Sequence, residues 1–225
     1  MPTVRYLGHS VFAFEHDGKT ALVDPWLTGN PKASISADQV AADVIFLTHG
    51  HIDHIGDTVA IAKRTGAPVV AIVEIAAELD DEGLQTIGPN IGGKVDLGWV
   101  TVQLTAAWHT STTPKGTVNT PAGLIIEIGG KRIYDLGDTA VFSDLALPKQ
   151  RGHLDLAILP IGGFFTMDRH DAVIAAGLIG ADQYIPCHYD TMPVIETDPQ
   201  AFKTDVESAG HGEVIVLAPG QAHEL

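Results

Sequence analysis

The chain has 225 residues, of which 45% are hydrophobic, so one large domain can bury a substantial core. Its 28 acidic residues outnumber the 13 basic ones, and the formal net charge of −15 disfavours binding to the phosphate backbone of a nucleic acid. No apolar run reaches the ~18 to 20 residues that a membrane-spanning helix needs, and the single cysteine, Cys187, excludes an internal disulfide.

The N-terminal sequence, MPTVRYLGHS, lacks the charged segment and the apolar segment of a secretory signal. A single cysteine also fits a reducing compartment. We therefore expect one domain over residues 1–225 and a cytoplasmic location.

The first fifty residues have the pattern of β structure. Four β-prone runs are separated by turns: residues 4–7, 11–14, 20–23 and 44–47. His9 lies in the first turn, where a histidine is either structural or close to a site. Asp24 ends the third run just before Pro25, so it either starts a turn or orients a ligand imidazole from behind. Residues 28–43 are polar and predict a surface loop.

Four metal-capable residues follow the fourth run within a few positions: His49, His51, Asp53 and His54. If the chain stays extended here, the two-residue period places His49 and His51 on one face, and Asp53 continues the row. A helix is predicted just past Gly56, so His54 would lie at a strand-to-helix junction. Histidine and carboxylate together suit zinc, iron or manganese. The alternative is an exposed histidine-rich loop without a fixed site.

Helices and strands alternate after this cluster. The predicted elements are helices at 57–65, 74–81, 171–179 and 199–209, a helical segment reaching about residue 149, strands at 68–73, 156–159, 183–186 and 213–217, and hairpins at 92–107 and 123–136. Three further metal-capable residues, His109, Asp138 and His188, stand at predicted strand ends. Residues 110–121 form a long polar loop of the kind that often carries function.

The motifs THGHIDH, AWHTS, LGDT and PCHYDT occur in this order at increasing distances, a pattern that resembles the metallo-β-lactamase superfamily. More narrowly, YLGHS, LVDPWL, IGGKVDLG and LPIGGFFTMDRHDA resemble a branch of small metal-dependent hydrolases. This branch is more distantly similar to the ascorbate-phosphate lactonase and to N-acyl phosphatidylethanolamine phospholipase D. The resemblance implies an α/β fold, a four-layer αββα sandwich of two mixed sheets with helices outside and the site at one edge.

The resemblance also implies a centre of two divalent metal ions, with zinc as the first expectation and manganese or iron as alternatives. One ion would be held by His49, His51 and His109, the other by Asp53, His54 and His188, with Asp138 bridging. In this branch His9 also lies near the site. One departure is Asp190, where the resemblance leads us to expect a glycine. Hydrolases of this branch further imply a homo-oligomer.

The chemistry follows from this ligand set. Two ions ~3.5 to 4 Å apart can share a water and lower its pKa toward ~7, which presents a bridging hydroxide as nucleophile. Asp53 would orient that hydroxide and pass its proton on, and we expect His9 to assist it as the second catalytic residue. The expected function is hydrolysis of a small, anionic ester, lactone or phosphodiester. The alternative is a metal-binding regulatory protein without turnover.

Substrate recognition is predicted from the few cations of an acidic chain. Lys115 lies in the polar loop after His109, and Arg169 adjoins the FFTMDRH segment, so both are candidates for binding an anionic substrate. His170 could line the same pocket or be structural. Cys187 precedes His188 on a strand, and alternation points its thiol to the opposite face, where it would pack in the core.

Overall fold

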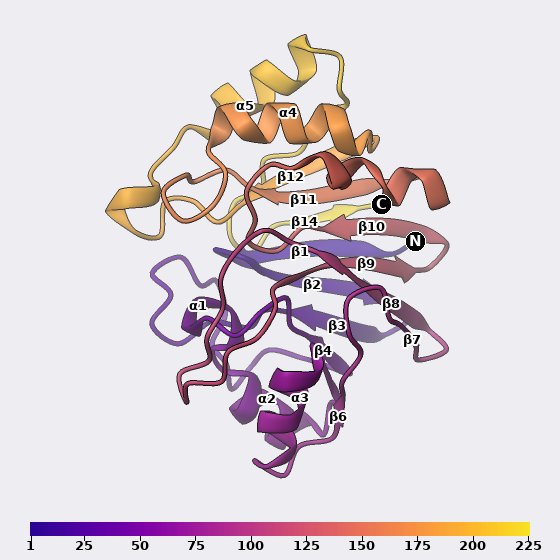
Figure 1. Cartoon of the computed structure of the whole chain (residues 1–225), viewed down its shortest axis with the longest axis vertical. Coiled ribbons are helices and arrows are strands. Elements are labelled where there is room, and N and C mark those ends of the chain that lie inside the picture. The colour runs from indigo at the N-terminus through magenta and orange to yellow at the C-terminus, as the bar shows by residue number, and fades with distance from the viewer.

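The computed structural model describes residues 1–225 and contains two seven-stranded mixed sheets (Figure 1). The first has the order β14-β1-β2-β3-β4-β5-β6, and the second has the order β13-β12-β11-β10-β9-β8-β7. The strands of the first are β1 (Thr3–Gly8), β2 (Val11–His16), β3 (Lys19–Val23), β4 (Val44–Phe46), β5 (Val69–Val70), β6 (Thr86–Ile87) and β14 (Ala222–Glu224). Those of the second are β7 (Lys94–Asp96), β8 (Val100–Ala106), β9 (Ala122–Ile128), β10 (Lys131–Asp135), β11 (Leu156–Pro160), β12 (Gln183–Cys187) and β13 (Glu213–Val214).

Helices lie outside both sheets. They are α1 (Ile52–Ile55), α2 (Thr58–Thr65), α3 (Val73–Asp80), α4 (Arg169–Ile179) and α5 (Pro199–Ser208), with the 3₁₀ helices η1 (Ser143–Ala146), η2 (Pro148–Arg151) and η3 (Pro193–Ile195). Figure 1 shows α4 and α5 over β11 and β12, and α2 and α3 on the far side of the first sheet. No helix has the length and hydropathy that crossing a membrane requires.

The core follows from side-chain alternation along the strands. In β8, Val102 and Leu104 are fully buried and face the other sheet, whereas Gln103 and Thr105 on the opposite face are partly exposed. In β11 every residue is buried, because Ile158 packs in the cluster shared by both sheets and its neighbours pack beneath the helices. The shared cluster contains 42 buried residues, and an 18-residue cluster lies between the second sheet and α4 and α5.

The fold predicted from the sequence is confirmed: two mixed sheets with helices outside. Most predicted elements occur within a few residues of their expected bounds. The predicted strand at 68–73 is wrong in its length, because only Val69–Val70 pairs with its neighbours. The helical segment near residue 149 consists of two 3₁₀ turns, since Pro148 begins a new turn there. The short edge strands β6 and β14 were not predicted.

The parallel strands bring several strand ends to one edge of the molecule. β3, β4 and β5 run parallel in the first sheet, as do β10, β11 and β12 in the second. In parallel sheets the loops that follow the strands gather at a common edge, which is where such folds hold ligands. The chain leaving β4 enters α1 at this edge, seen at the left in Figure 1.

Candidate metal centre

The histidine-rich motif is not a continuous strand. β4 ends at Phe46, and α1 begins at Ile52, so Asp53 and His54 lie on a single helical turn. The predicted extended row through Asp53 is therefore wrong, and the helix begins inside the motif. The helix stops at Gly56, where φ is 29° and an added Cβ would lie 2.5 Å from Trp26 Cα. Only glycine allows the chain to pass so close to this neighbour.

Seven metal-capable residues nevertheless converge from both sheets. They are His49 and His51 after β4, Asp53 and His54 on α1, His109 after β8, Asp138 after β10, and His188 directly after β12. Six of them belong to two groups of converging ring nitrogens and carboxylate oxygens, and a third, overlapping group joins His49 and His54 to Asp24. Asp138 lies close to both of the first two groups.

The first group contains His49, His51 and His109, whose ligand-capable atoms all lie within 4.8 Å of one another. Asp138 faces this group, since its Oδ2 lies 3.5 Å from His109 Nε2 and 3.9 Å from His49 Nε2. Three imidazoles with one further position open are a common arrangement around a tetrahedral metal ion.

The second group contains Asp53, His54, His188 and also His9, again with their candidate atoms within 4.8 Å. Asp138 reaches this group as well, with Oδ2 3.1 Å from His188 Nε2 and Oδ1 3.4 Å from His54 Nε2. Asp138 thus lies between the two groups, the position that a bridging carboxylate requires.

Several atoms at the meeting point are buried without a hydrogen-bond partner. They are Nε2 of His54, His109 and His188, and Oδ1 of Asp138. Each such orphaned group costs ~1 to 3 kcal/mol when nothing satisfies it. Imidazole nitrogens and carboxylate oxygens aimed at a common point are the donor set for a divalent ion such as zinc, so these residues fit a metal centre.

The charges within the cluster are strongly coupled. Burial lowers the pKa of His49, and the neighbouring His54 lowers it further. Burial also opposes the charged form of His188, but Asp138 outweighs it and raises the pKa of His188 to about 9. The pKa of Asp138 is well below its usual range, because the cationic His188 and His54 overcome the effect of burial. Without metal the cluster therefore retains protons that metal binding has to displace.

Asp24 contacts the cluster from behind. Its Oδ2 lies 2.7 Å from His54 Nδ1 and accepts a 2.6 Å hydrogen bond from Thr48 Oγ1, while Oδ1 accepts from the Thr48 backbone N–H. Thr48 Oγ1 also lies 3.0 Å from His49 Nδ1. Of the two roles that the sequence left open for Asp24, these contacts favour the orientation of imidazoles over turn initiation alone. Thr48 was missed, and its only sequence signal is that it directly precedes His49.

His9 is fully buried and lies between Asp53 and Thr191, a residue that was not predicted from the sequence. His9 Nε2 lies 3.2 Å from Asp53 Oδ2, and His9 Nδ1 lies 2.7 Å from Thr191 Oγ1. Burial lowers the pKa of His9 to about 4, so its ring is neutral at pH 7. Nothing in the sequence distinguishes Thr191 except its place three residues after His188.

Asp190, the departure from the expected glycine, adopts a left-handed conformation with φ of 58°. Aspartate is one of the few residues other than glycine that tolerate this region. Its Oδ1 accepts a 3.0 Å hydrogen bond from the Thr197 backbone N–H, so it stabilises the loop beside the site.

The two predicted substrate-binding cations are engaged elsewhere. The Lys115 ammonium contacts the carboxylate of Glu82, and the Arg169 guanidinium contacts that of Asp205. The structure therefore does not bring either cation to the seven candidate ligands. His170 is the second residue of α4, and its backbone N–H donates to Asp168 Oδ1.

Cys187 is buried and belongs to the cluster shared by both sheets. The prediction that its thiol packs in the core is confirmed. His188, the next residue, faces the candidate ligands instead.

Comparisons with known proteins agree with this geometry. Residues 3–188 match the model of the beta-lactamase superfamily domain. The UPF0173 metal-dependent hydrolase of Shouchella clausii (strain KSM-K16) is 47% identical over 229 residues, which cover 99% of each chain. The UPF0173 metal-dependent hydrolase of Thermococcus onnurineus (strain NA1) is 45% identical over 229 residues, covering 100% of both chains.

Among solved structures, the chain is similar to Igni18, a novel metallo hydrolase from the hyperthermophilic archaeon Ignicoccus hospitalis. The TM-score is 0.91 at 37% identity, with 100% of this chain and 99% of that chain covered. The sequence, the fold and the converging histidines and carboxylates lead to one conclusion: the chain belongs to the beta-lactamase superfamily and is a metal-dependent hydrolase.

Proposed function

We propose that this hydrolase works with two divalent metal ions. His49, His51 and His109 would hold one, Asp53, His54 and His188 the other, and Asp138 would bridge them. The supporting observation is the set of buried, unpartnered Nε2 atoms that face Asp138 from both groups. We propose zinc first because imidazoles dominate the set, with manganese or iron as alternatives.

When bound, two such ions supply a water of lowered pKa and a positive contact for a carbonyl or phosphoryl oxygen. We assign Asp53 the role of orienting that water, because its side chain is 21% exposed whereas Asp138 is buried. Asp53 Oδ2 can also accept a proton. The neutral His9 steadies Asp53 by donating from Nε2, while His9 Nδ1 accepts from the Thr191 hydroxyl.

The hydrogen bonds that link Thr191, His9 and Asp53 define the role of His9. By donating from Nε2, His9 would fix the direction of the Asp53 carboxylate, and Thr191 would hold the His9 ring in the tautomer that does so. His9→Ala should therefore lower kcat more than it raises KM, whereas a role in binding alone would change KM.

We propose that the substrate is a small ester, lactone or phosphodiester. A preference for an anionic group would come from the centre, since two divalent ions exceed the negative charge of Asp53, Asp138 and a hydroxide by about one unit. Lys115 and Arg169 support this preference less than the sequence suggested, because both are paired with carboxylates.

The test is metal analysis combined with an activity screen. The protein is saturated with zinc, manganese or iron, dialysed, and analysed for bound ions, and each form is assayed on phosphodiesters, lactones and esters. Two ions per chain and turnover of at least one class are expected. A stoichiometry of at most one ion at saturation would refute the binuclear centre, and two ions without any turnover would favour a non-catalytic metal protein.

A further inference from the structure

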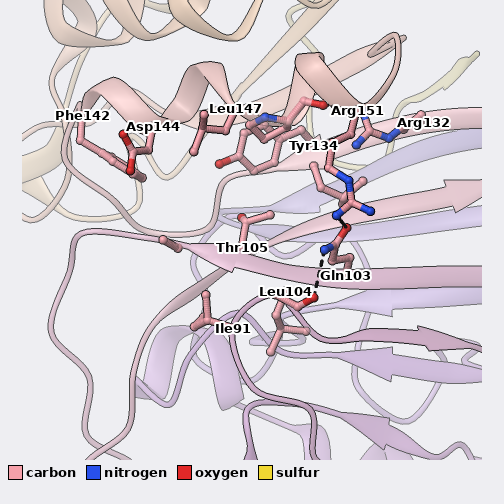
Figure 2. Close-up of a pocket in the computed structure, with 14 residues that line it drawn as sticks. Ile91, Gln103, Leu104, Thr105, Arg132, Tyr134, Phe142, Asp144, Leu147 and Arg151 are labelled. Atoms are coloured by element: carbon pink, nitrogen blue, oxygen red, sulfur yellow. Dashed lines mark hydrogen bonds between the residues drawn. The ribbon is translucent and has the colours of Figure 1, made fainter.

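A groove on the outer face of the second sheet lies apart from the candidate ligands and has a volume of about 220 Å³. Its floor is formed by the outward side chains of β8, β9 and β10, among them Ile125 and Tyr134. One wall comes from the segment through η1 and η2, with Phe142 and Leu147, and Ile91 lies on the other side (Figure 2). We call this the β8 groove.

The β8 groove exists because helices cover only part of this sheet face. The 18-residue cluster beneath α4 and α5 is centred on β10, β11 and β12, whereas β8 has only the short 3₁₀ turns beside it. Leu147 consequently remains 51% exposed, although it adjoins the buried ring of Tyr134 along the groove. An exposed apolar surface of this kind, set in a hollow, is characteristic of a binding site.

Charged side chains stand only at the two ends of the groove (Figure 2). At the far end Arg151 Nη1 donates to Gln103 Oε1 over 3.3 Å, and Gln103 Nε2 donates to the Gly92 carbonyl over 3.0 Å. At the other end Asp144 lies beside Phe142. Between the ends the lining is uncharged and largely apolar, interrupted by the hydroxyls of Thr105 and Tyr134 (Figure 2), so it suits an uncharged hydrocarbon group of limited length.

Two chain segments connect the Phe142 end of the β8 groove to the candidate metal centre. Ala106 lines the groove and His109 follows three residues later; Phe142 lines it and Asp138 precedes it by four residues. The two segments are joined by hydrogen bonds from Trp108 N–H to Thr139 Oγ1 (2.9 Å) and from Ala140 N–H to the Trp108 carbonyl (3.0 Å). Three residues span at most ~11 Å, so Ala106 lies within that distance of His109 at the Cα atoms.

Trp108 occupies the corner between the centre and the groove. This residue is 70% exposed, and its ring centroid lies 6.5 Å from that of Phe142. Apolar surface therefore continues from the residue beside His109 to the mouth of the groove, without an intervening charge other than Asp144.

We propose that the β8 groove holds the hydrocarbon tail of the substrate whose ester or lactone bond is cleaved at the metal centre. This inference rests on the proposed hydrolase function. A tail of about eight carbon atoms, with C–C bonds of ~1.5 Å, is at most ~11 Å long, which equals the upper limit between His109 and Ala106 at the mouth of the groove. Hydrolysis joins the water oxygen to the acyl carbon, breaks the bond from that carbon to the alkoxy oxygen, and transfers a water proton to the leaving oxygen.

The test compares two substrates and variants of two exposed aliphatic residues. The metal-loaded full chain is assayed on p-nitrophenyl acetate and p-nitrophenyl octanoate, in the wild type and in Leu147→Ser and Ile174→Ser. Ile174 is a matched control, because it is 57% exposed but lies on α4, away from the groove. Leu147→Ser should lower the octanoate-to-acetate ratio of kcat/KM about 5-fold, since part of one buried side-chain contact is lost. Ile174→Ser should leave the ratio unchanged.

A second measurement needs no turnover. Octan-1-ol is titrated into the metal-free protein, and binding should weaken in Leu147→Ser but not in Ile174→Ser. If the acetate is hydrolysed while the ratio is the same in both variants and octan-1-ol does not bind, the tail site is refuted and the hydrolase stands. If neither ester is hydrolysed but octan-1-ol binding depends on Leu147, the tail site stands and the ester hydrolase fails.

Self-association is the remaining competing explanation for the exposed groove. If Leu147→Ser abolishes a concentration-dependent oligomer but leaves the substrate ratio unchanged, the groove is an interface between copies of this chain. That outcome would overturn the proposal.

Discussion

Asp24→Asn tests whether one buried carboxylate sets the protonation of ligands in both metal groups. Asp24 is 1% exposed, and its Oδ2 lies within hydrogen-bond distance of both His54 Nδ1 and Thr48 Oγ1. A carboxylate only accepts, so His54 keeps a proton on Nδ1, and a metal ion would displace only the proton on its Nε2, which faces Asp138. An asparagine amide at the same place donates instead and forces the neutral ring to protonate Nε2.

The same reversal of hydrogen-bond direction would also reach His49 through the Thr48 hydroxyl. In the native protein the Thr48 hydroxyl donates to Asp24, so its oxygen accepts from His49 Nδ1–H over 3.0 Å. If the residue at position 24 donates to Thr48, the Thr48 hydroxyl turns to donate to His49 Nδ1. His49 then also carries its proton on Nε2, the nitrogen that a metal needs.

The expected magnitude follows from these contacts. Loss of a residue behind a ligand commonly costs ~10 to 100-fold in metal affinity, and Asp24 acts on one ligand of each group. We expect both ions to bind ~10 to 100-fold more weakly, or ~1.4 to 2.7 kcal/mol each. Replacing a charged acceptor by a neutral one should also lower the free energy of unfolding by ~1 to 3 kcal/mol.

The assay is competition with a chromophoric chelator at pH 7.5, together with thermal unfolding of the metal-free protein. Asp43→Asn is the control, because Asp43 is an exposed carboxylate that accepts a 2.8 Å hydrogen bond from the Thr20 N–H far from the ligands. A folded Asp24→Asn protein with wild-type affinity for both ions would refute the tautomer argument. Weakening of only one ion would show that Thr48 does not transmit the change.

Four further outcomes are expected. Asp138→Ala should reduce the bound metal below two ions per chain and lower turnover at least ~10²-fold, measured by metal analysis and steady-state kinetics. Chelator competition should show metal affinity falling as the pH drops below about 9, by ~10-fold per pH unit or more, because His188, with a pKa raised to about 9, and the cationic His54 must each lose a proton to bind. Cys187→Ser should leave kcat within ~2-fold when metal-loaded, since the thiol packs in the core. Lys115→Ala should change KM for a phosphorylated or carboxylated substrate by no more than ~2-fold, because Lys115 is paired with Glu82; a selective rise in KM for the anionic substrate would show that Lys115 binds it.

Much of the candidate site was predictable because its signals are local. Strands such as β8 were visible from alternation alone, and the candidate ligands His109 and His188 stand where such runs end. Metal-capable side chains are conspicuous at those places, since a strand end on an apolar sheet rarely needs a histidine. The pairing of the ligands, in contrast, came from the resemblance and not from spacing.

The remainder depends on contacts between distant residues. Lys115 pairs with Glu82 and Arg169 with Asp205, and nothing near either cation in the sequence announces these partners. Thr48 and Thr191 resemble any other threonine until the fold places them against His49 and His9. The β8 groove likewise exists only because two 3₁₀ turns replace the helix that the sequence predicted near residue 149.

Three strand ends show how the fold holds the site. His9, Asp24 and His188 directly follow β1, β3 and β12, and all three have left-handed backbones, with φ of 60°, 46° and 53°. Such a conformation costs a non-glycine residue ~1 to 3 kcal/mol and persists only where the surroundings impose it. Here the backbone supplies a restraint: the His188 N–H donates to the His9 carbonyl over 2.9 Å, which joins the first sheet to the second at this edge. A left-handed residue turns the chain away from the strand direction, and here the side chains of these same three residues face the cluster. The 42-residue core holds both sheets in place and thereby sustains this strain, which positions His9 and His188 around Asp53.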